Sequence, residues 1–342
     1  MKETEFQKEF CFFQLIKEGN DLNIIEVKNL SKSYDNFQAV KGINFTVEKG
    51  EVFGFLGPNG AGKTTTINML TGLAKPSSGE ITIAGENGID GIKKVQQVIG
   101  IVPDESNLYD DMSGFDNLVF CASLYGMKKS LREKRATELL KQFSLDDTGD
   151  RPFKAYSKGM KRKLTIAAGI IHSPEILFLD EPTTGIGVES ARQIRRMIKE
   201  LNQKGTTIFL TTHYIEDAER LCHRIGFIVT GNVIKVSKVE KLMRDAQQDN
   251  IVEFRTDKNN LDLKDQLLST FPDISILSQS KNCIRISSPF SIELMPFMQF
   301  FEGLNIKISE AKIIHPSLEE VFVKITGIEI NKLKKEQEGQ KR

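Results

Sequence analysis

The sequence has 342 residues, with 47 Lys and Arg against 46 Asp and Glu and a formal net charge of +1. At roughly 100–200 residues per domain this length predicts about two domains, and 39% hydrophobic with 27% charged residues excludes a disordered, collagen-like or membrane-bundle protein. The balanced charge argues against nucleic acid as a partner, because no basic excess is present to neutralise a phosphate backbone.

Residues 1–23 predict a helical N-terminal extension, because Phe6, Phe10, Phe13 and Ile16 recur every three to four residues. This apolar face fits a helix packed on the body of the protein, and it also fits a helix on a partner or membrane surface. The acidic start does not resemble a secretory signal, and no stretch reaches the ~18–20 apolar residues that span a bilayer. We therefore expect a cytoplasmic protein with no membrane span of its own.

Residues 24–244 predict an α/β domain. Strands are expected at Ile24–Val27 and Ile43–Val47, and residues 48–51 predict a turn before the next strand. Largely apolar runs, suited to strands buried on both faces, follow at Val52–Leu56, Ile176–Leu179, Thr207–Leu210 and Arg224–Val229. Helical stretches separate these runs, as in a parallel α/β sheet, and a helical subdomain is expected at about residues 106–171.

Residues 245–327 predict a second, smaller domain. Strands at 251–255, 274–277, 284–287 and 306–314 alternate with helices at 263–271 and 291–304. This β-α-β-β-α-β order is that of a ferredoxin-like fold. A last helix is expected from Ser317, where Ser317 and Glu320 fit a capping box. Residues 328–342 are rich in Lys, Glu and Gln and predict a frayed, charged tail.

A glycine-rich loop follows the apolar run that ends at Leu56. Residues 57–64 match the phosphate-loop pattern, in which two glycines separated by four residues precede Lys and a hydroxyl residue. The glycines let backbone N–H groups converge on phosphate oxygens, and the helix from Lys63 to about Leu70 aims its positive N-terminus at the same anion. We expect Lys63 to bind the β- and γ-phosphates and Thr64 to bind Mg²⁺. The expected nucleotide contacts in this loop are Gly57, Pro58, Asn59, Gly60, Ala61, Gly62, Lys63, Thr64 and Thr65.

Two carboxylates, Asp180 and Glu181, follow the apolar run Ile176–Leu179. Charges at the end of a buried strand are costly unless they bind something. We therefore expect Asp180 on the Mg²⁺ side of the site, and Glu181 to polarise an attacking water.

A third motif begins Tyr156-Ser157-Lys158-Gly159-Met160. A hydroxyl residue near a glycine at a helix start suits a second phosphate-facing N-terminus, although taken alone it fits a plain helix cap equally well. With the two preceding motifs it closely resembles the signature of ABC-type ATPases, in the variant frequent in ATP-binding subunits of daunorubicin and multidrug exporters. The resemblance implies an α/β P-loop cassette, with a mixed-sheet core and helical subdomain, followed by a small α+β ferredoxin-like accessory domain.

The same resemblance implies roles for residues outside the three motifs. Tyr34 corresponds to the aromatic residue that stacks on adenine, and His213 corresponds to the switch histidine that contacts the γ-phosphate. Together with Glu181 and Lys63, His213 completes the expected catalytic set. Residues 316–322 are similar to the end of the accessory domain found in this family.

The resemblance also implies a dimer and a set of cofactors. In the family two cassettes pair head to tail, so Ser157 and Gly159 would serve the nucleotide of the other subunit of a homodimer or related pair. ATP and Mg²⁺ are the expected cofactors, with Thr64, Asp180 and Asp104 as the expected metal ligands. Hydrolysis in such a site is phosphoryl transfer to water, achieved by positioning and charge stabilisation.

Two positions depart from the family pattern. Asp104 stands where the family usually has a Gln that touches Mg²⁺ or the attacking water, and we expect this change to be tolerated. Gly187 stands where the family normally has an Asp that organises the dimer interface, which leaves both a coupled and a slow ATPase open. The signature also contains a basic run, which consists of Lys158, Lys161, Arg162 and Lys163. This run predicts a solvated or ion-paired helix face, and the alternative is that it aids nucleotide or permease docking.

The sequence therefore predicts the ATP-hydrolysing subunit of an ABC transporter, peripheral at the inner face of the cell membrane. It would power a separate transmembrane permease, with export of a drug-like, peptide, lipid or ion substrate expected. The alternative is a nucleotide-binding regulatory module with slow hydrolysis. The ABC proteins of translation and DNA repair fit less well, because the chain has a single phosphate loop and no room for a coiled coil between Lys63 and Ser157.

Overall fold

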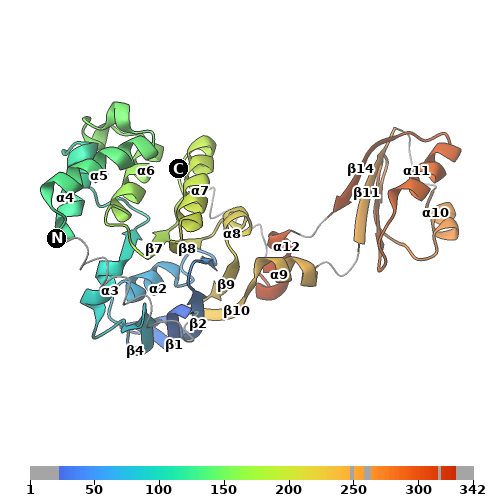
Figure 1. Cartoon of the computed structure of the whole chain (residues 1–342). Coiled ribbons are helices and arrows are strands. Elements are labelled where there is room, and N and C mark those ends of the chain that lie inside the picture. Colours follow the sequence, from blue (N-terminus) through green and yellow to red (C-terminus); the bar gives the residue numbers. More distant parts are fainter. Residues whose placement is uncertain (1–22, 247–249, 258–262, 315–316, 329–342) are drawn as a thin grey trace, which may run out of the picture. The chain divides into compact units, whose positions relative to one another are not determined.

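The computed structural model describes residues 23–246, 250–257, 263–314 and 317–328 (Figure 1). The chain forms two compact units. Of the described residues, the first contains 23–239 and 325–328, and the second lies within Glu240–Lys324. The predicted domain boundary at residues 244 and 245 stays a prediction. The predicted N-terminal helix and most of the predicted tail lie outside the described residues, whereas Asn23 already belongs to the first strand.

The main sheet of the first unit has six strands in the order β10-β9-β3-β8-β7-β6. The five strands from β9 to β6 are parallel, and β10 pairs antiparallel with β9. The strands are β3 (Val52–Leu56), β6 (Ile99–Val102), β7 (Ile176–Asp180), β8 (Thr207–Thr212), β9 (Arg224–Val229) and β10 (Asn232–Lys238). Every residue of β3, β7 and β8 is buried, as expected for parallel strands covered on both faces.

A second, antiparallel sheet packs against the same core in the order β2-β1-β4-β5. It comprises β1 (Asn23–Tyr34), β2 (Phe37–Glu48), β4 (Ser78–Ile83) and β5 (Glu86–Asn87). Phe45 of this sheet stacks on Phe53 and packs at a tilt against Phe55 and Phe209 of the main sheet, with ring centroids 5.4–5.9 Å apart. Aromatic burial of this kind joins the two sheets into one hydrophobic core.

Helices lie on the main sheet and form the predicted helical subdomain. Those near the sheet are α2 (Lys63–Leu70), α3 (Ile92–Val98), α7 (Val188–Gln203) and α8 (Ile215–Leu221). The subdomain contains α4 (Gly114–Leu124), α5 (Lys129–Gln142), η1 (Asp146–Thr148), η2 (Phe153–Ala155) and α6 (Lys158–Gly169), grouped together in Figure 1. Ser113 caps α4 and Ser157 caps α6, each accepting a hydrogen bond from the backbone N–H three residues later.

The second unit has a four-stranded antiparallel sheet in the order β12-β13-β11-β14, with helices α10 and α11 packed on a core that contains Phe254, Phe297 and Phe301. Its elements are α9 (Val239–Ala246), β11 (Asn250–Thr256), α10 (Lys264–Thr270), β12 (Ser275–Ser280), β13 (Cys283–Ser288), α11 (Leu294–Gly303), β14 (Ile308–Ile314) and α12 (Leu318–Thr326). From β11 to β14 this element order agrees with the predicted ferredoxin-like arrangement. Ser317 and Glu320 also form the predicted capping box before α12.

Candidate functional site

The phosphate loop connects β3 to α2, and its glycines are required by the backbone. Gly60 and Gly62 have φ of 75° and 105°, a region that favours glycine. A Cβ on Gly57 would lie only 2.1 Å from the carbonyl oxygen of Ile228. Helix α2 begins at Lys63 with no side-chain cap and no acidic residue in its first turn, so its first N–H groups face the loop without an intramolecular anion. The loop therefore fits an external anion.

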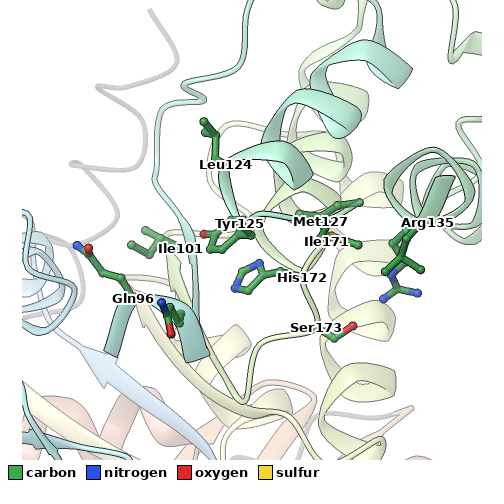
Figure 2. Close-up of a pocket in the computed structure, with 11 residues that line it drawn as sticks. Gln96, Ile101, Leu124, Tyr125, Met127, Arg135, Ile171, His172 and Ser173 are labelled. Carbon is green, nitrogen blue, oxygen red and sulfur yellow. The ribbon is translucent and has the colours of Figure 1, made fainter. Parts of the chain in front are cut away.

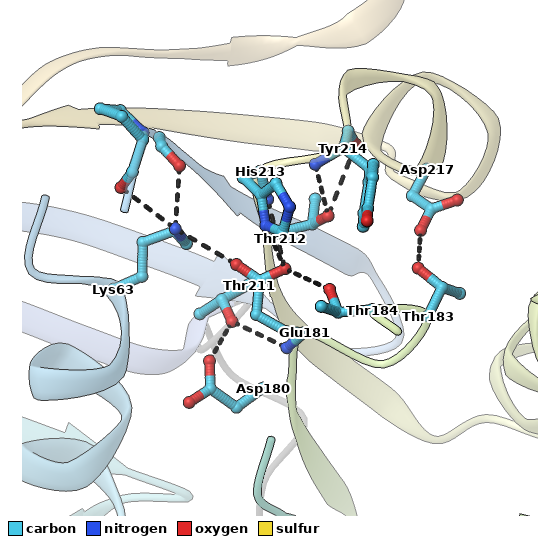
Figure 3. Close-up of polar contacts among 12 residues, drawn as sticks. Lys63, Asp180, Glu181, Thr183, Thr184, Thr211, Thr212, His213, Tyr214 and Asp217 are labelled. Carbon is cyan, nitrogen blue, oxygen red and sulfur yellow. Dashed lines mark hydrogen bonds and ion pairs between the residues drawn. The ribbon is translucent and has the colours of Figure 1, made fainter. Parts of the chain in front are cut away.

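Lys63 is buried and its ammonium group is surrounded by oxygen atoms. Nζ donates to the carbonyl oxygens of Gly57 at 2.9 Å and Pro58 at 3.2 Å. Its third neighbour is Oε1 of Glu181, at 3.2 Å (Figure 3). This contact brings together two residues that are far apart in the sequence and that the motifs predicted to share one site.

Glu181 is the centre of the polar cluster in Figure 3. Its Oε2 lies 2.8 Å from Nδ1 of His213 and accepts a hydrogen bond from the hydroxyl of Thr184 at 3.1 Å. Burial raises the pKa of Glu181, but the hydrogen bond from His213 and the charge of Lys63 outweigh that effect and lower the pKa to about 2. Glu181 is therefore ionised, and Lys63, Glu181 and His213 form one buried clasp.

Asp180 and Asp104 lie close to this clasp. Asp180 ends β7, is almost fully buried and accepts a hydrogen bond from the hydroxyl of Thr211 on the neighbouring strand β8. Burial raises the pKa of Asp104, and the nearby charge of Arg162 opposes that rise. A hydroxyl and one or two carboxylates suit Mg²⁺, which keeps waters and phosphate oxygens as its other ligands. The exposed Thr64 hydroxyl, Asp180 and Asp104 fit that description.

The site also has a buried nitrogen atom that fits a nucleotide. Nε2 of His213 lacks a hydrogen-bond partner among the described groups, although the residue is only 3% exposed. An unpaired buried nitrogen is costly. Because Nδ1 donates to Glu181, Nε2 is a donor only in the doubly protonated ring, and in that form a phosphate oxygen is a suitable acceptor for it. The open N-terminus of α2, the ammonium of Lys63 and this nitrogen together fit a magnesium nucleotide.

Ser157 and Gly159 occupy the start of α6, as the sequence predicted. The Ser157 hydroxyl accepts a hydrogen bond from the N–H of Met160 at 3.3 Å, and a Cβ on Gly159 would lie 2.2 Å from Oγ of Ser190. Within the described residues, no contact joins Ser157 or Gly159 to Glu181. The arrangement is compatible with a signature that serves another subunit.

Tyr34 ends β1 with its side chain 47% exposed. Nζ of Lys32 lies 4.8 Å from the centre of the Tyr34 ring. No contact of the described chain joins Tyr34 to the clasp, so its predicted adenine contact stays a prediction. Exposure leaves the ring free to stack on a planar group.

The prediction that the basic run forms a solvated or ion-paired helix face is wrong for Arg162. Lys161 pairs with Asp110 at 3.2 Å as expected, but Arg162 is 6% exposed and lies behind the two carboxylates of the site. Its guanidinium donates to backbone carbonyl oxygens of both the Asp104 loop and the Asp180–Pro182 segment. This role was not predictable from the sequence, because the acceptors are backbone atoms of distant segments.

A second group that the sequence did not reveal holds the loop after Glu181. The hydroxyl of Thr183 donates to Oδ2 of Asp217 in α8, and Oδ1 of Asp217 pairs with Arg195 of α7 at 2.5 Å. Asp217 is almost fully buried, so this pair fixes the loop against two helices.

A cavity of about 1020 Å³ lies between β6 and the helical subdomain (Figure 2). The rings of Tyr125 and His172 stack there, with centroids 3.6 Å apart. Burial lowers the pKa of His172, and Nε2 donates to the carbonyl oxygen of Ile99 at 2.9 Å. The lining residues are Gln96, Gln97, Ile101, Leu124, Tyr125, Met127, Leu131, Arg135, Ile171, His172 and Ser173.

In the described part of the chain, no helix combines the length and apolar character needed to cross a bilayer. Residues 40–184 match the protein family described as ABC transporter. Among solved structures, an ATP-binding subunit of an ABC transporter is 30% identical, with a TM-score of 0.60 over 65% of this chain and 93% of that one. A dimeric post-hydrolysis structure of the ATP-binding cassette MJ0796, bound to ADP and Pi, is 28% identical, with a TM-score of 0.59 over 63% of this chain and 98% of that one.

Similarity to curated proteins extends through both units. The linearmycin resistance ATP-binding protein LnrL of Bacillus subtilis is 34% identical over 89% of this chain and 98% of its own length. The daunorubicin/doxorubicin resistance ATP-binding protein DrrA of Streptomyces peucetius is 34% identical over 89% of this chain and 92% of its own length. The fold, the site and these relatives agree, and the chain belongs to the ABC transporter family as an ATP-binding subunit that hydrolyses ATP.

Proposed function

We propose that this ATPase powers export through a separately encoded membrane permease, with a drug-like, peptide, lipid or ion substrate. The names of its relatives support export, since they include resistance proteins for linearmycin and daunorubicin/doxorubicin and the Nod factor export ATP-binding protein I of Burkholderia pseudomallei. The observation that carries the motor role is the Lys63–Glu181–His213 clasp beside the phosphate loop.

The clasp supports a separate role in hydrolysis for each group of the site. The N-terminus of α2 and Lys63 would hold the phosphates, and Mg²⁺ held by Thr64, Asp180 and Asp104 would stabilise negative charge on them. Glu181 would orient and polarise the attacking water, and the unpaired Nε2 of His213 would contact the γ-phosphate. Binding a phosphate would draw Lys63 away from Glu181, which would raise the pKa of the carboxylate toward a value useful for a base.

Two surfaces would serve partners. Ser157 and Gly159 would complete the nucleotide site of a second copy of the chain, so that two ATP molecules lie in a head-to-tail dimer. The cavity beside β6 would receive a segment of the permease, because it lies next to the Asp104 loop and presents apolar side chains together with Arg135. Movement at the nucleotide would then reach the membrane partner through one short loop.

The catalytic part is tested by steady-state ATPase assays on the wild type, Glu181→Gln and Lys63→Ala. We expect Glu181→Gln to keep nucleotide binding and lose about 10²–10⁴-fold in kcat, the usual contribution of a general base. Lys63→Ala should bind ATP weakly. Light scattering of Glu181→Gln with MgATP should show a dimer. A wild type that binds ATP but turns over no faster than Glu181→Gln would instead indicate a regulatory module.

The permease contact is tested by photocrosslinking in native membranes. Benzoylphenylalanine at Leu124, which lines the cavity and is 70% exposed, should crosslink to an integral membrane protein. The matched control is the same probe at Leu73, which is 64% exposed and lies outside the cavity. Equal crosslinking at both positions, or none at Leu124, would contradict the proposed docking place.

A further inference from the structure

Arg162 lies in the second turn of α6 and uses every hydrogen atom of its guanidinium group. Nε donates to the carbonyl oxygen of Pro182 at 3.0 Å. One terminal nitrogen donates to the carbonyl oxygens of Pro103 and of Asp104, the latter at 3.0 Å. The other donates to the carbonyl oxygens of Asp180 and of Glu181, the latter at 2.7 Å. Five N–H donors therefore meet five backbone acceptors, which is the full capacity of an arginine.

These acceptors belong to two separate loops of the nucleotide site. Pro103 and Asp104 follow β6, whereas residues 180–182 follow β7. Among the described residues no side-chain carboxylate accepts from Arg162, so the contact fixes main-chain positions and is not an ordinary ion pair. A lysine could not reproduce it, because an ammonium group has three donors on one atom and lacks the planar fork of a guanidinium.

The backbone of Glu181 needs such support. Its φ is 48°, in the left-handed region that residues with a side chain adopt rarely and that persists only where the surroundings hold it. The N–H of Glu181 donates to the backbone carbonyl and the hydroxyl of Thr211, both at 3.2 Å. Its carbonyl oxygen accepts a hydrogen bond from Arg162 at 2.7 Å. The two contacts together fix the direction in which the carboxylate leaves the strand.

We propose that Arg162 is a positioning residue for hydrolysis, which aligns Glu181 and the Asp104 loop from behind the site. The proposal rests on the catalytic role of Glu181 proposed above. Because Ser157 caps the same helix that carries Arg162, α6 mechanically links the signature to the carboxylate of its own subunit. Displacement of the signature by a nucleotide of the partner subunit would therefore shift the backbone of Glu181.

The test compares Arg162→Lys with the wild type of the full-length chain, with ATP turnover and nucleotide affinity measured separately. We expect Arg162→Lys to lower kcat by about 10²-fold, since a misplacement of about 1 Å can cost that much. KM and the dissociation constant for MgATP should change by less than about 3-fold, because Arg162 does not face the phosphate loop. In a Glu181→Gln background the same substitution should lower the residual rate by less than about 3-fold, since the group it positions is already absent.

A destabilised control separates positioning from folding. Leu164→Ala removes a fully buried side chain from the same helix and leaves the Arg162 side chain unchanged. The inference would be overturned if Arg162→Lys lost no more kcat than Leu164→Ala. It would also be overturned if Arg162→Lys lowered the rate by the same factor in the Glu181→Gln background as in the wild type. Wild-type turnover no faster than Glu181→Gln would overturn the catalytic role of Glu181 and this inference with it. If the wild type turns over much faster than Glu181→Gln and Arg162→Lys has a normal kcat, only the inference about Arg162 is overturned.

Discussion

Glu181 is the residue on which the electrostatics of the site converge. Its carboxylate contacts Lys63 and His213 while buried, and the favourable contacts lower its pKa from 4.5 to about 2. A group whose pKa is lowered in the folded state stabilises the fold at pH values at which it is ionised in both the folded and the unfolded state. Its contribution is therefore complete above about pH 4.5 and is lost as the pH falls toward 2.

This shift gives a pH-dependent prediction for stability. The difference in free energy of unfolding between the wild type and Glu181→Gln should be constant near neutral pH and should fall by about 2 kcal/mol between about pH 7 and pH 3. Urea unfolding at several pH values measures it. The control is Glu216→Gln, which removes an exposed pair with Arg220 and should change stability by less than about 1 kcal/mol at any pH. A constant difference down to pH 3 would mean that the clasp does not lower the pKa.

The clasp and Arg162 show which parts of a site the sequence can predict. The phosphate loop and the carboxylate pair were predictable because each is a short pattern at the end of an apolar run, and the carboxyl ends of the parallel strands of one sheet lie at the same edge. Arg162 was not, since its partners are carbonyl oxygens and every sequence has those at every position. Within a run of lysines, a buried arginine resembles its solvated neighbours.

The loop between β7 and α7 contains Gly187, one of the two positions at which the family resemblance implies a different residue. Gly187 is the N-cap of α7, with φ of −68° and ψ of 156°, and it provides no side-chain cap. A Cβ at this position would meet nothing within 4 Å. The backbone thus accepts a larger residue without strain, and the loop is held from its other end by Thr183 and Asp217.

Gly187→Asp should therefore stabilise the protein. An Asp side chain would cap α7 and interact favourably with the helix dipole, for a combined gain of about 0.3–1 kcal/mol in the free energy of unfolding. Urea unfolding measures the gain, and ATPase assays of the same variant show whether the missing Asp limits hydrolysis. The matched control is Gly185→Asp, which has equal space but a φ of 72° and should destabilise. Equal effects of both substitutions would contradict this account of the cap.

At the scale of the whole molecule, apolar pattern predicted the buried strands and missed the shorter or more exposed ones. The run Val52–Leu56 became β3 with unchanged ends, because burial on both faces leaves a continuous apolar signal. Strands β4, β5, β6 and β10 were not predicted. Strand β6 has only four residues, and β10 is a partly exposed edge strand that contains Lys235 and Lys238. Their positions depend on pairing with strands elsewhere in the chain, which a local pattern does not report.

Each unit has a hydrophobic core of its own, one containing Phe209 and the other Phe254. Domains with separate cores can unfold separately, so calorimetry of the full chain should resolve two transitions. Phe254→Ala, which removes a fully buried ring at a cost of about 3–5 kcal/mol, should lower the melting temperature of one transition and leave the other within about 2 °C.

ATP identifies the transitions, because a ligand stabilises only the unit that binds it. At about 100 times its dissociation constant, MgATP adds about 2.7 kcal/mol, which should raise the melting temperature of the nucleotide-binding unit by about 5–10 °C. The transition lowered by Phe254→Ala should not move with MgATP, and Lys63→Ala should abolish the shift of the other. A single transition that responds to both Phe254→Ala and MgATP would show that the two cores unfold as one cooperative unit. The division at residues 244 and 245 would then not mark independent domains.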